Sequence, residues 1–409
     1  MEELSGVQNL DLMGGSSQLK VEALWDVDRA RTPFSDESIS FLTQLSSRLL
    51  RDRSFRSRFP DGAAFGYFVR RSSLLKARNH YESLCVLSGG PRPAIGRVLQ
   101  FAPANVEIIS MYTWAIAVMC GCPTVVRLSS RRSQLTEELL SVIDQVALEC
   151  CFKKSWRFVD FPREDTDLSN SLAKSTDLLV LWGGDESVLR LRQLPIPATS
   201  RVLSFPNRES LAVIDSKKFL ALSTVEKKLV SQLVHRDIAL FGQNACSSTR
   251  SVVWVGSDCS DQAQGALIEF WRKDESLLVE FDLAELSRRR GYLFEVIAKS
   301  QGPISFNEAG GFLIIRGLLM RDRKVVHPAS GLVTFHTVDT LEHVSKHLVK
   351  GDQTLTQFGF EREEIKKWFQ SSEYAIPLRV VGIGKSAEFS LMWDGFDLIY
   401  EFTRGCCIG

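Results

Sequence analysis

One cysteine of the chain has the surroundings expected of a nucleophile. Cys246 lies in the polar segment 243–248 (Gln-Asn-Ala-Cys-Ser-Ser), after an amphipathic run at 225–240 and before a β-rich run at 251–255. Active-site residues are commonly held on loops between rigid elements. An accessible cysteine with polar neighbours can ionise, and the thiolate is the nucleophilic form. We therefore expect Cys246 to be catalytic; the alternative is a cysteine that only packs.

Asn105 is a second candidate for chemistry. It follows an expected strand at 97–101 and precedes an apolar run at 106–120, which predicts a buried helix. A side-chain amide at this point can donate a hydrogen bond to a developing oxyanion. Asparagine is also a common helix N-cap, and that structural role is the alternative.

Two further segments follow expected strands, where α/β sheets bind ligands, and could contact a cofactor. Ser129, Ser130, Arg131 and Arg132 follow an expected strand at 124–128. Hydroxyls, helix amides and guanidinium groups suit a phosphate. An acid that would bind the ribose hydroxyls of NAD is absent from this segment, which favours NADPH. The alternative is a helix at 134–148 that Ser129 and Ser130 cap.

Gly183 and Gly184 form the second of these segments, between an expected strand at 177–182 and a helix. Glycines at such a turn allow the backbone to approach a cofactor closely. The G-x-G-x-x-G pattern of dinucleotide sites is missing, so an ordinary turn before Asp185 is equally compatible with these residues.

The histidines of the chain form no metal-binding pattern. His343 and His347 share a helical face but lack the acid of a metalloprotease motif. His235, Arg236 and Asp237 lie on the expected helix at 225–240, which precedes Cys246. The residues alone leave a Cys–His hydrolase pair open.

Composition limits the class of protein. The 409 residues include 44% hydrophobic and 24% charged residues, which is typical of a globular protein of two or three domains. The net charge of +1 indicates no field for nucleic acid or an anionic membrane, and the longest apolar run, 108–122, is too short for a membrane span. The odd number of cysteines, nine, and the lack of a signal peptide predict reduced thiols in the cytoplasm.

The order of the expected elements predicts an α/β fold. A loose arm at 1–35 and helices from 36 precede an alternation of strands and helices that begins at 94. Such alternation is typical of a doubly wound, mainly parallel sheet. Beyond Cys246 we expect helices at 263–271, 278–300 and 340–349, a loop at 302–310 and a strand at 332–335.

Several of these segments together resemble a known family. Phe-Ala-Pro-Ala-Asn at 101–105, the segments 125–131, 181–186 and 243–248, and Phe-Ser-Leu-Met-Trp-Asp-Gly-Phe-Asp-Leu at 389–398 occur in this order. The set resembles the long-chain acyl-CoA reductase family of bioluminescence systems (LuxC-like), within the aldehyde dehydrogenase superfamily. The resemblance covers roughly residues 90 to 404.

The resemblance implies an aldehyde-dehydrogenase-like α/β fold: a doubly wound, parallel-sheet cofactor domain and an α/β catalytic domain. It places an N-terminal helical or arm region at 1–90 and the NADPH-binding domain at 91–240. The catalytic domain with Cys246 would then occupy 241–375, and a C-terminal segment at 376–409 would pack on the cofactor domain or at an oligomer interface.

The resemblance also assigns roles to single residues. Cys246 falls on the nucleophile, and Asn105 falls on the oxyanion amide, with the Cys246 backbone N–H as its partner. Gly183 and Gly184 fall on the turn near the cofactor phosphates, and His327 falls where aldehyde dehydrogenases have a ribose-binding glutamate. The residues at the adenosine ribose and 2′-phosphate of NADPH would be Arg127, Ser129, Ser130 and Arg131.

One departure from the superfamily bears on the reaction. Hydrolytic aldehyde dehydrogenases carry a glutamate general base, and Phe205 lies near that position here. Without a base, water is a poor nucleophile toward an acyl-enzyme, which favours its resolution by hydride. The resemblance thus implies an NADPH-dependent acyl-CoA reductase, an aldehyde-forming oxidoreductase that needs no metal.

The same resemblance implies an acyl-CoA or acyl-carrier thioester as substrate, a homo-oligomer, and an acyl-protein synthetase or carrier protein as a partner. Two alternatives stay open. One is a cysteine-dependent acyltransferase or thioesterase without hydride transfer, and the other is a non-catalytic binding subunit.

Overall fold

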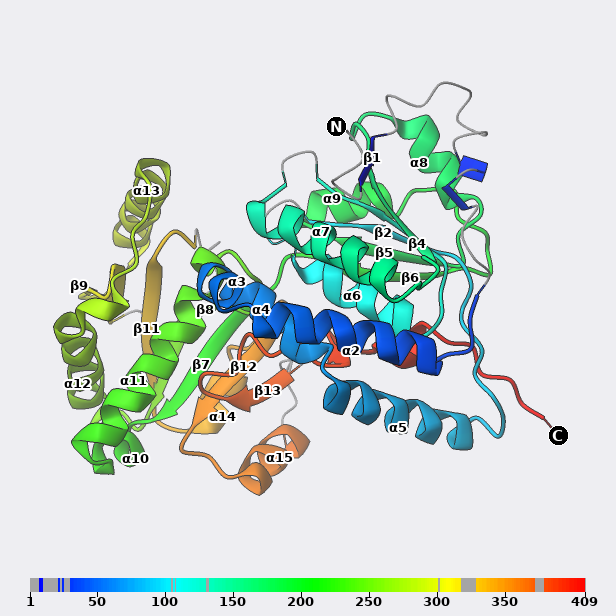
Figure 1. Ribbon diagram of the computed structural model, residues 1–409. Coiled ribbons are helices and arrows are strands. Elements are labelled where there is room, and N and C mark those ends of the chain that lie inside the picture. Colours follow the sequence, from blue (N-terminus) through cyan, green and yellow to red (C-terminus); the bar gives the residue numbers. More distant parts are fainter. Residues whose placement is uncertain are drawn as a thin grey trace. The chain divides into compact units, whose positions relative to one another are not determined.

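A computed structural model of the chain describes residues 7–9, 21–22, 24–25, 30–103, 106, 108–129, 132–300, 302–317, 329–371 and 379–408. The chain forms two compact units (Figure 1). The first contains Met1–Pro206 and Phe389–Gly409, and the second contains Asn207–Glu388. Each unit is built around its own sheet.

The sheet of the first unit has the strand order β1-β4-β3-β2-β5-β6, with neighbouring strands parallel. From β2 the chain moves outward to β3 and β4 and then returns to the other side of β2 to form β5. The strand order therefore reverses between β2 and β5. The strands are β1 (Val7–Asn9), β2 (Val98–Phe101), β3 (Thr124–Arg127), β4 (Trp156–Asp160), β5 (Leu178–Trp182) and β6 (Arg201–Phe205).

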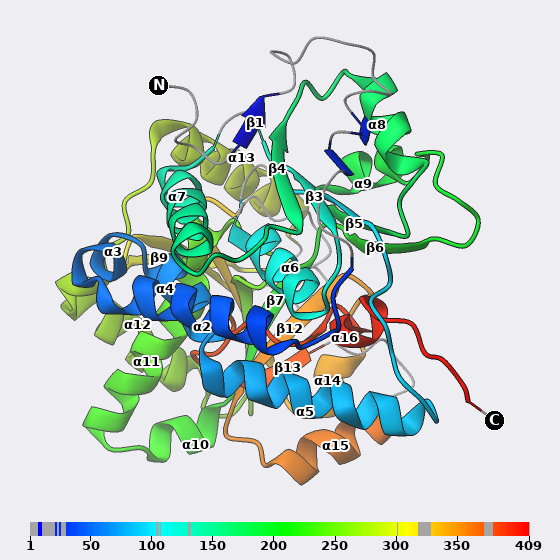
Figure 2. The ribbon, with the colours of Figure 1, turned by 45° about the vertical axis from the view of Figure 1, so that its right-hand side comes forward.

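Helices cover both faces of this sheet (Figure 2). Leu99 and Leu179 point into a core that includes side chains of α8 (Thr166–Ala173) and α9 (Asp185–Leu191). On the other face, Thr113 of α6 (Ile108–Met119) donates a hydrogen bond to Gln100 of β2. The expectation of a doubly wound sheet is confirmed.

A layer of helices precedes this sheet in the chain: α2 (Asp36–Arg51), α3 (Arg53–Arg58), α4 (Pro60–Phe68) and α5 (Arg71–Leu87). Helix α2 packs against α4 and against α7 (Gln134–Glu149). It begins after Ser35, whose hydroxyl accepts a hydrogen bond from the backbone N–H of Ser38, as expected of a cap.

The end of the chain returns to the first unit. It forms a short hairpin, β14 (Met392–Trp393) and β15 (Phe396–Asp397), and helix α16 (Leu398–Glu401). The buried guanidinium of Arg92 donates to Thr403 Oγ1 and to the carbonyl oxygens of Tyr400 and Thr403. These bonds tie the returning segment to the stretch between α5 and β2.

The sheet of the second unit has the order β13-β12-β7-β8-β11-β10-β9. Strand β9 is antiparallel to β10, and the other pairings are parallel. The expected loop at 302–310 was wrong, because β9 lies within it. Gly310 and Gly311, at φ 59° and 85°, form the tight turn of the β9–β10 hairpin rather than marking a loop. The strands are β7 (Glu209–Asp215), β8 (Thr249–Val255), β9 (Ser305–Ala309), β10 (Phe312–Arg316), β11 (Leu332–Val338), β12 (Asp352–Phe358) and β13 (Arg379–Gly382).

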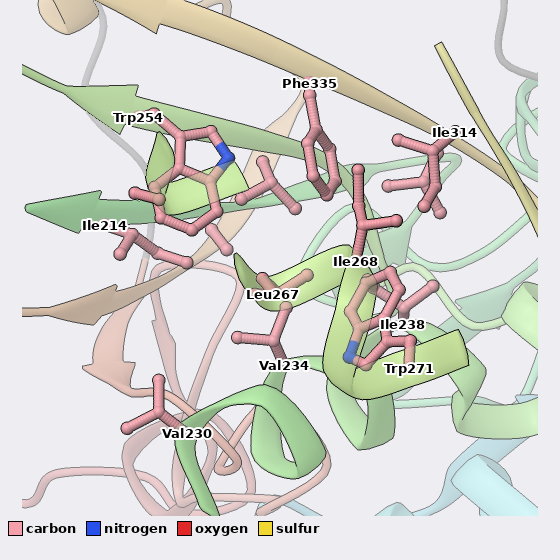
Figure 3. Close-up of a cluster of buried hydrophobic side chains, with 14 of the residues drawn as sticks. Ile214, Val230, Val234, Ile238, Trp254, Leu267, Ile268, Trp271, Ile314 and Phe335 are labelled. Carbon is pink, nitrogen blue, oxygen red and sulfur yellow. The ribbon is translucent and has the colours of Figure 1, made fainter. Parts of the chain in front are cut away.

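Helices cover both faces of this sheet as well. A large core that includes Trp254, Trp271 and Phe335 lies between the sheet and helices α10 to α12, and part of it is shown in Figure 3. Helices α14 and α15 pack on the other face. The helices are α10 (Ser216–Ala221), α11 (Thr224–Ala239), α12 (Ser260–Lys273), α13 (Leu283–Lys299), α14 (Leu341–Ser345) and α15 (Arg362–Ser371).

Helix α13 is shorter than the expected helix at 278–300. It begins after Asp282, which forms a reciprocal capping box with Glu285. The cap satisfies the first backbone N–H groups of the helix, so the helix begins at Leu283 and does not include residues 278–282.

The two units divide the sequence differently from the domains we expected. Strand β7 pairs with β8 and β12, so residues 207–240 lie in the second unit rather than with the sheet of the first unit, where we expected them. Strand β13 pairs with β12, so only the part of the expected C-terminal segment from Phe389 onward returns to the first unit.

A buried carboxylate fixes the chain after β13. Asp237 of α11 is 2% exposed and accepts hydrogen bonds from the backbone N–H groups of Gly384 and Ser386, at 2.6 and 3.2 Å, and from the Ser386 hydroxyl at 2.8 Å. Burial raises the pKa of Asp237, and these hydrogen bonds partly offset the rise.

We expect Asp237→Ala to lower the free energy of unfolding by roughly 2–3 kcal/mol, because three buried donors lose their acceptor. Urea denaturation followed by circular dichroism measures this change. The matched control is Asp261→Ala, whose 92% exposed carboxylate pairs with Arg316 and should cost under about 1 kcal/mol. Equal losses in the two variants would contradict the assignment.

Candidate active site

The structure places Cys246 on the loop between α11 and β8, in the second unit. The residue is partly buried, and its Sγ accepts a hydrogen bond from Gln353 Nε2 at 3.3 Å. The hydroxyl of Ser210 donates to the Cys246 carbonyl oxygen at 2.7 Å. Ser210 and Gln353 are at most 2% exposed, so a partly accessible thiol lies on a buried polar support.

The backbone before Cys246 has an unusual conformation. Phe241, Gly242 and Gln243 follow one another in the left-handed region, at φ 51°, 58° and 66°. A second run, Ala329, Ser330 and Gly331, has φ of 57°, 55° and 75° directly before β11. Non-glycine residues in this region cost about 1 kcal/mol or more each. Such strain is retained only where the surrounding structure holds it.

Gln243 supplies that hold. Its side chain is fully buried; Oε1 accepts from Gly331 N at 3.1 Å, and Nε2 donates to Leu332 O at 2.7 Å. One amide therefore joins the two left-handed runs and fixes the cysteine loop against the start of β11. From the sequence, Gln243 was identified only as a polar neighbour of Cys246, and its role in holding the loop was not predicted. Its position three residues before the thiol is the feature that could have indicated this role.

His235 does not have the surroundings of a catalytic base. It is 4% exposed, its ring lies against Trp271 and Phe312, and Nε2 lies 3.2 Å from Gly310 O. Burial lowers the pKa of His235, and the backbone carbonyls of Gly310 and Leu277 partly offset this. The residue is a satisfied core histidine.

The described candidate cofactor residues, Arg127, Ser129, Gly183 and Gly184, lie in the first unit, at the carboxyl edge of its sheet. Arg127 ends β3, and its Nη2 donates to Phe161 O at 3.0 Å. Ser129 is 8% exposed and follows the same strand. The cap of α7 is Ser133, whose hydroxyl accepts a hydrogen bond from Thr136 N, so the expectation of a cap at 129–130 was wrong.

The end of β5 is open to close approach. Gly183 has φ 154°, and an added Cβ there would meet the Ser187 side chain only at 3.6 Å. Gly184 is the N-cap of α9 and offers backbone groups without a side chain. These two glycines leave the backbone accessible at the point where the strand order reverses.

Phe205 is held in a stack of aromatic rings. Its ring lies parallel to that of Trp182, with 3.9 Å between centroids, and meets the edge of Phe396 at 5.8 Å. It is 3% exposed. The position that the superfamily resemblance relates to a general base therefore holds a side chain that cannot accept a proton.

The positive charges of Arg163 and Arg190 act on Arg127. Burial lowers the pKa of Arg127, and the positive charges of Arg163 and Arg190 lower it further, against Asp160 and Glu164. The pattern of residues in the sequence did not single out Arg163 or Arg190. The sequence gives little indication of their role, because Arg163 follows β4 and Arg190 lies on α9. These elements are distant in the sequence, and only the strand order brings them together.

Other expected site residues, Asn105, Ser130, Arg131 and His327, lie outside the described residues. Within the described ranges, no cluster of three or more His, Cys, Asp or Glu side chains has a geometry suited to a metal ion. No helix in those ranges is long and apolar enough to cross a membrane.

The family resemblance is confirmed by comparison with known proteins. Residues 91–275, which include Cys246, match the family model described as acyl-CoA reductase (LuxC). The chain is 23% identical over 175 residues to the long-chain acyl-protein thioester reductase of Aliivibrio fischeri, a match that covers 42% of this chain and 34% of that protein. It is 23% identical over 93 residues to the long-chain acyl-protein thioester reductase 2 of Photobacterium leiognathi, covering 23% and 18%. The matches span about a third or less of these relatives.

Solved structures confirm the aldehyde-dehydrogenase-like fold. An aldehyde dehydrogenase of Mycobacterium tuberculosis has a TM-score of 0.67 at 11% identity, covering 95% of this chain and 88% of that chain. The betaine aldehyde dehydrogenase of Staphylococcus aureus has a TM-score of 0.63 at 13% identity, covering 91% and 79%. At these identities the similarity establishes the fold.

The buried His235 predicts a pH dependence of stability. The unfolded chain protonates this histidine below about pH 6.5, whereas the folded chain resists protonation because the pKa is lowered. The free energy of unfolding should therefore fall as pH drops from about 6.5 toward the lower pKa of the folded state.

His235→Met removes this contribution, so the loss of stability between about pH 7.5 and 5.5, measured by urea denaturation, should be smaller than in the wild type. His343→Gln is the control, because that side chain is 43% exposed. An unchanged pH dependence in His235→Met would count against the assignment.

Proposed function

We propose that the chain reduces an acyl thioester to an aldehyde with NADPH, through an acyl group carried on Cys246. The observation that carries this proposal is the partly accessible thiol of Cys246, which accepts a hydrogen bond from the buried amide of Gln353. The thiol lies on a strained loop that Gln243 holds in place. The match of residues 91–275 to the acyl-CoA reductase family model supports the reaction class.

In the proposed reaction the Cys246 thiolate attacks the carbonyl carbon of the thioester. The carbon–sulfur bond of the substrate breaks, its thiol leaves, and the acyl group remains on Sγ. We assign the oxyanion contacts to the Asn105 amide and the Cys246 backbone N–H; each donor of this kind can be worth about 3 kcal/mol. When bound, NADPH supplies the hydride that converts the acyl group to an aldehyde.

The first unit offers suitable residues for that cofactor. Its strand order reverses between β2 and β5, where open α/β sheets bind ligands, and Gly183 and Gly184 lie at this edge. The guanidinium groups around Arg127 suit a 2′-phosphate, which supports NADPH rather than NADH. We assign the adenosine ribose and its phosphate to Arg127, Ser129, Ser130 and Arg131, and a ribose contact to His327.

Phe205 supports reduction over hydrolysis. Its phenyl ring is fixed between Trp182 and Phe396 and cannot activate water. In the proposed enzyme the acyl group on Cys246 would therefore resist hydrolysis and react with hydride instead.

The names of the two relatives favour a protein-bound acyl donor. Both are acyl-protein thioester reductases, so we propose an acyl-carrier or acyl-protein thioester beside acyl-CoA as the substrate. An acyl-protein synthetase or carrier protein would supply it to a cytoplasmic homo-oligomer.

Loss of NADPH absorbance with a panel of acyl-CoA and acyl-carrier thioesters tests the reaction. Cys246→Ala should reduce the rate at least ~1000-fold, because no other group takes over the covalent step. Cys259→Ala is the control in the same unit. Thiol release without NADPH oxidation would indicate an acyltransferase or thioesterase, and no turnover would indicate a binding subunit.

Arg163→Gln tests the cofactor preference. Removal of one positive charge near Arg127 should raise KM for NADPH roughly threefold to fivefold and leave KM for NADH nearly unchanged, because only NADPH carries the 2′-phosphate. Arg192→Gln, at the far end of α9, is the control. Equal effects of Arg163→Gln on both cofactors would contradict the placement of the 2′-phosphate.

A further inference from the structure

The pairing of β7 with its two neighbours, β12 and β8, is irregular at Ser210. Asp352 pairs with Glu209 and Leu355 pairs with Leu211, so two residues of β12 face the single Ser210 of β7. On the other side of β7, Ser210 pairs with Thr249 and Leu211 with Ser251, which leaves one extra residue on β8. Two bulges thus flank Ser210. Bulges redirect side chains and occur frequently next to active sites.

Ser210 links these bulges to the cysteine loop. It is fully buried, and its hydroxyl donates to Cys246 O at 2.7 Å and accepts from Thr354 N at 3.2 Å. A single hydroxyl therefore holds the backbone of the cysteine and the bulged part of β12. Because Gln353 directly precedes Thr354, the two hydrogen bonds of Ser210 also hold Gln353 near Cys246.

The bulge directs the amide of Gln353 to the sulfur. Gln353 is 2% exposed, and its Nε2 lies 3.3 Å from Cys246 Sγ. A buried N–H donor needs an acceptor within the protein, so burial here restricts where the N–H can point. A neutral thiol is a weak acceptor and a thiolate is a strong one, so this contact strengthens when the sulfur ionises.

We propose that Gln353 is a catalytic residue that donates a hydrogen bond to the Cys246 sulfur and stabilises its thiolate form. The inference rests on the proposed function for its place in the reaction, while the contact itself rests on the geometry of the second unit alone.

The sulfur is anionic at two points of the proposed reaction. The first is before attack on the thioester. The second is the collapse of the reduced intermediate: the alkoxide oxygen re-forms the carbonyl, the carbon–sulfur bond breaks, and its electron pair returns to Sγ as the aldehyde leaves. In the acyl-enzyme between them the sulfur is a poor acceptor. Gln353 therefore favours both the entry of the acyl group and the departure of the product.

Alkylation of Cys246 by iodoacetamide, followed across pH by mass spectrometry of its peptide, tests the contact without substrate or cofactor. Gln353→Met keeps the side-chain volume and removes the donor. We expect alkylation of Cys246 at neutral pH to slow by roughly three- to tenfold, and the midpoint of the pH–rate profile to move to higher pH. The exposed Cys151, Cys406 and Cys407 are internal references that should not change.

Gln353→Glu is a nearly isosteric second variant and keeps the test decisive if Gln353→Met fails to fold. Its carboxylate next to the sulfur should move the midpoint further upward, because like charges disfavour the thiolate. The matched control is Gln357→Met on the same strand, which removes an acceptor for Phe360 N and should leave the Cys246 profile unchanged.

A wild-type Cys246 profile in the folded Gln353 variants would overturn the proposal and reduce Gln353 to a packing residue. The alkylation result is independent of the reductase assay. If the wild type oxidises no NADPH but the profile shifts, the proposed function fails and the thiolate contact stands; if NADPH is oxidised and the profile does not shift, only the role of Gln353 fails.

Discussion

The side-chain amide of Gln243 is the interaction on which the candidate active site depends. It satisfies a donor at Gly331 and an acceptor at Leu332, and so holds together two backbone runs that are unfavourable on their own. In a buried setting, such a bond is strong when made and costly when lost. The cysteine loop is therefore an element of tertiary structure: its shape is determined by β11, about 90 residues further along the chain.

The two units use the same architecture for different purposes. In the first, a parallel sheet reverses its strand order and leaves glycines and arginines at one edge, which suits an anionic cofactor. In the second, a mainly parallel sheet supports a thiol through local irregularities of its strands. In both units the described candidate residues lie where a regular strand ends or is interrupted.

The sequence predicted the features that depend on neighbouring residues. The helix before Cys246 and the strand after it follow from periodicity, and the loop follows from its polar composition. The roles of Ser210 and Gln353 were not predictable in this way, because they reach Cys246 across 36 and 107 positions. Strand β7 illustrates the same limit: its apolar residues suit either sheet, and only pairing with β8 and β12 places it in the second unit.

The return of the chain to the first unit has a consequence for biosynthesis. During translation the second unit is complete once Glu388 has left the ribosome, whereas Arg92 must wait for partners about 310 positions later. Until they arrive, its guanidinium has only the Ser88 hydroxyl among the acceptors that the structure describes, which makes its burial unfavourable. The order of synthesis therefore allows the second unit to fold before the last residues of the first unit are available.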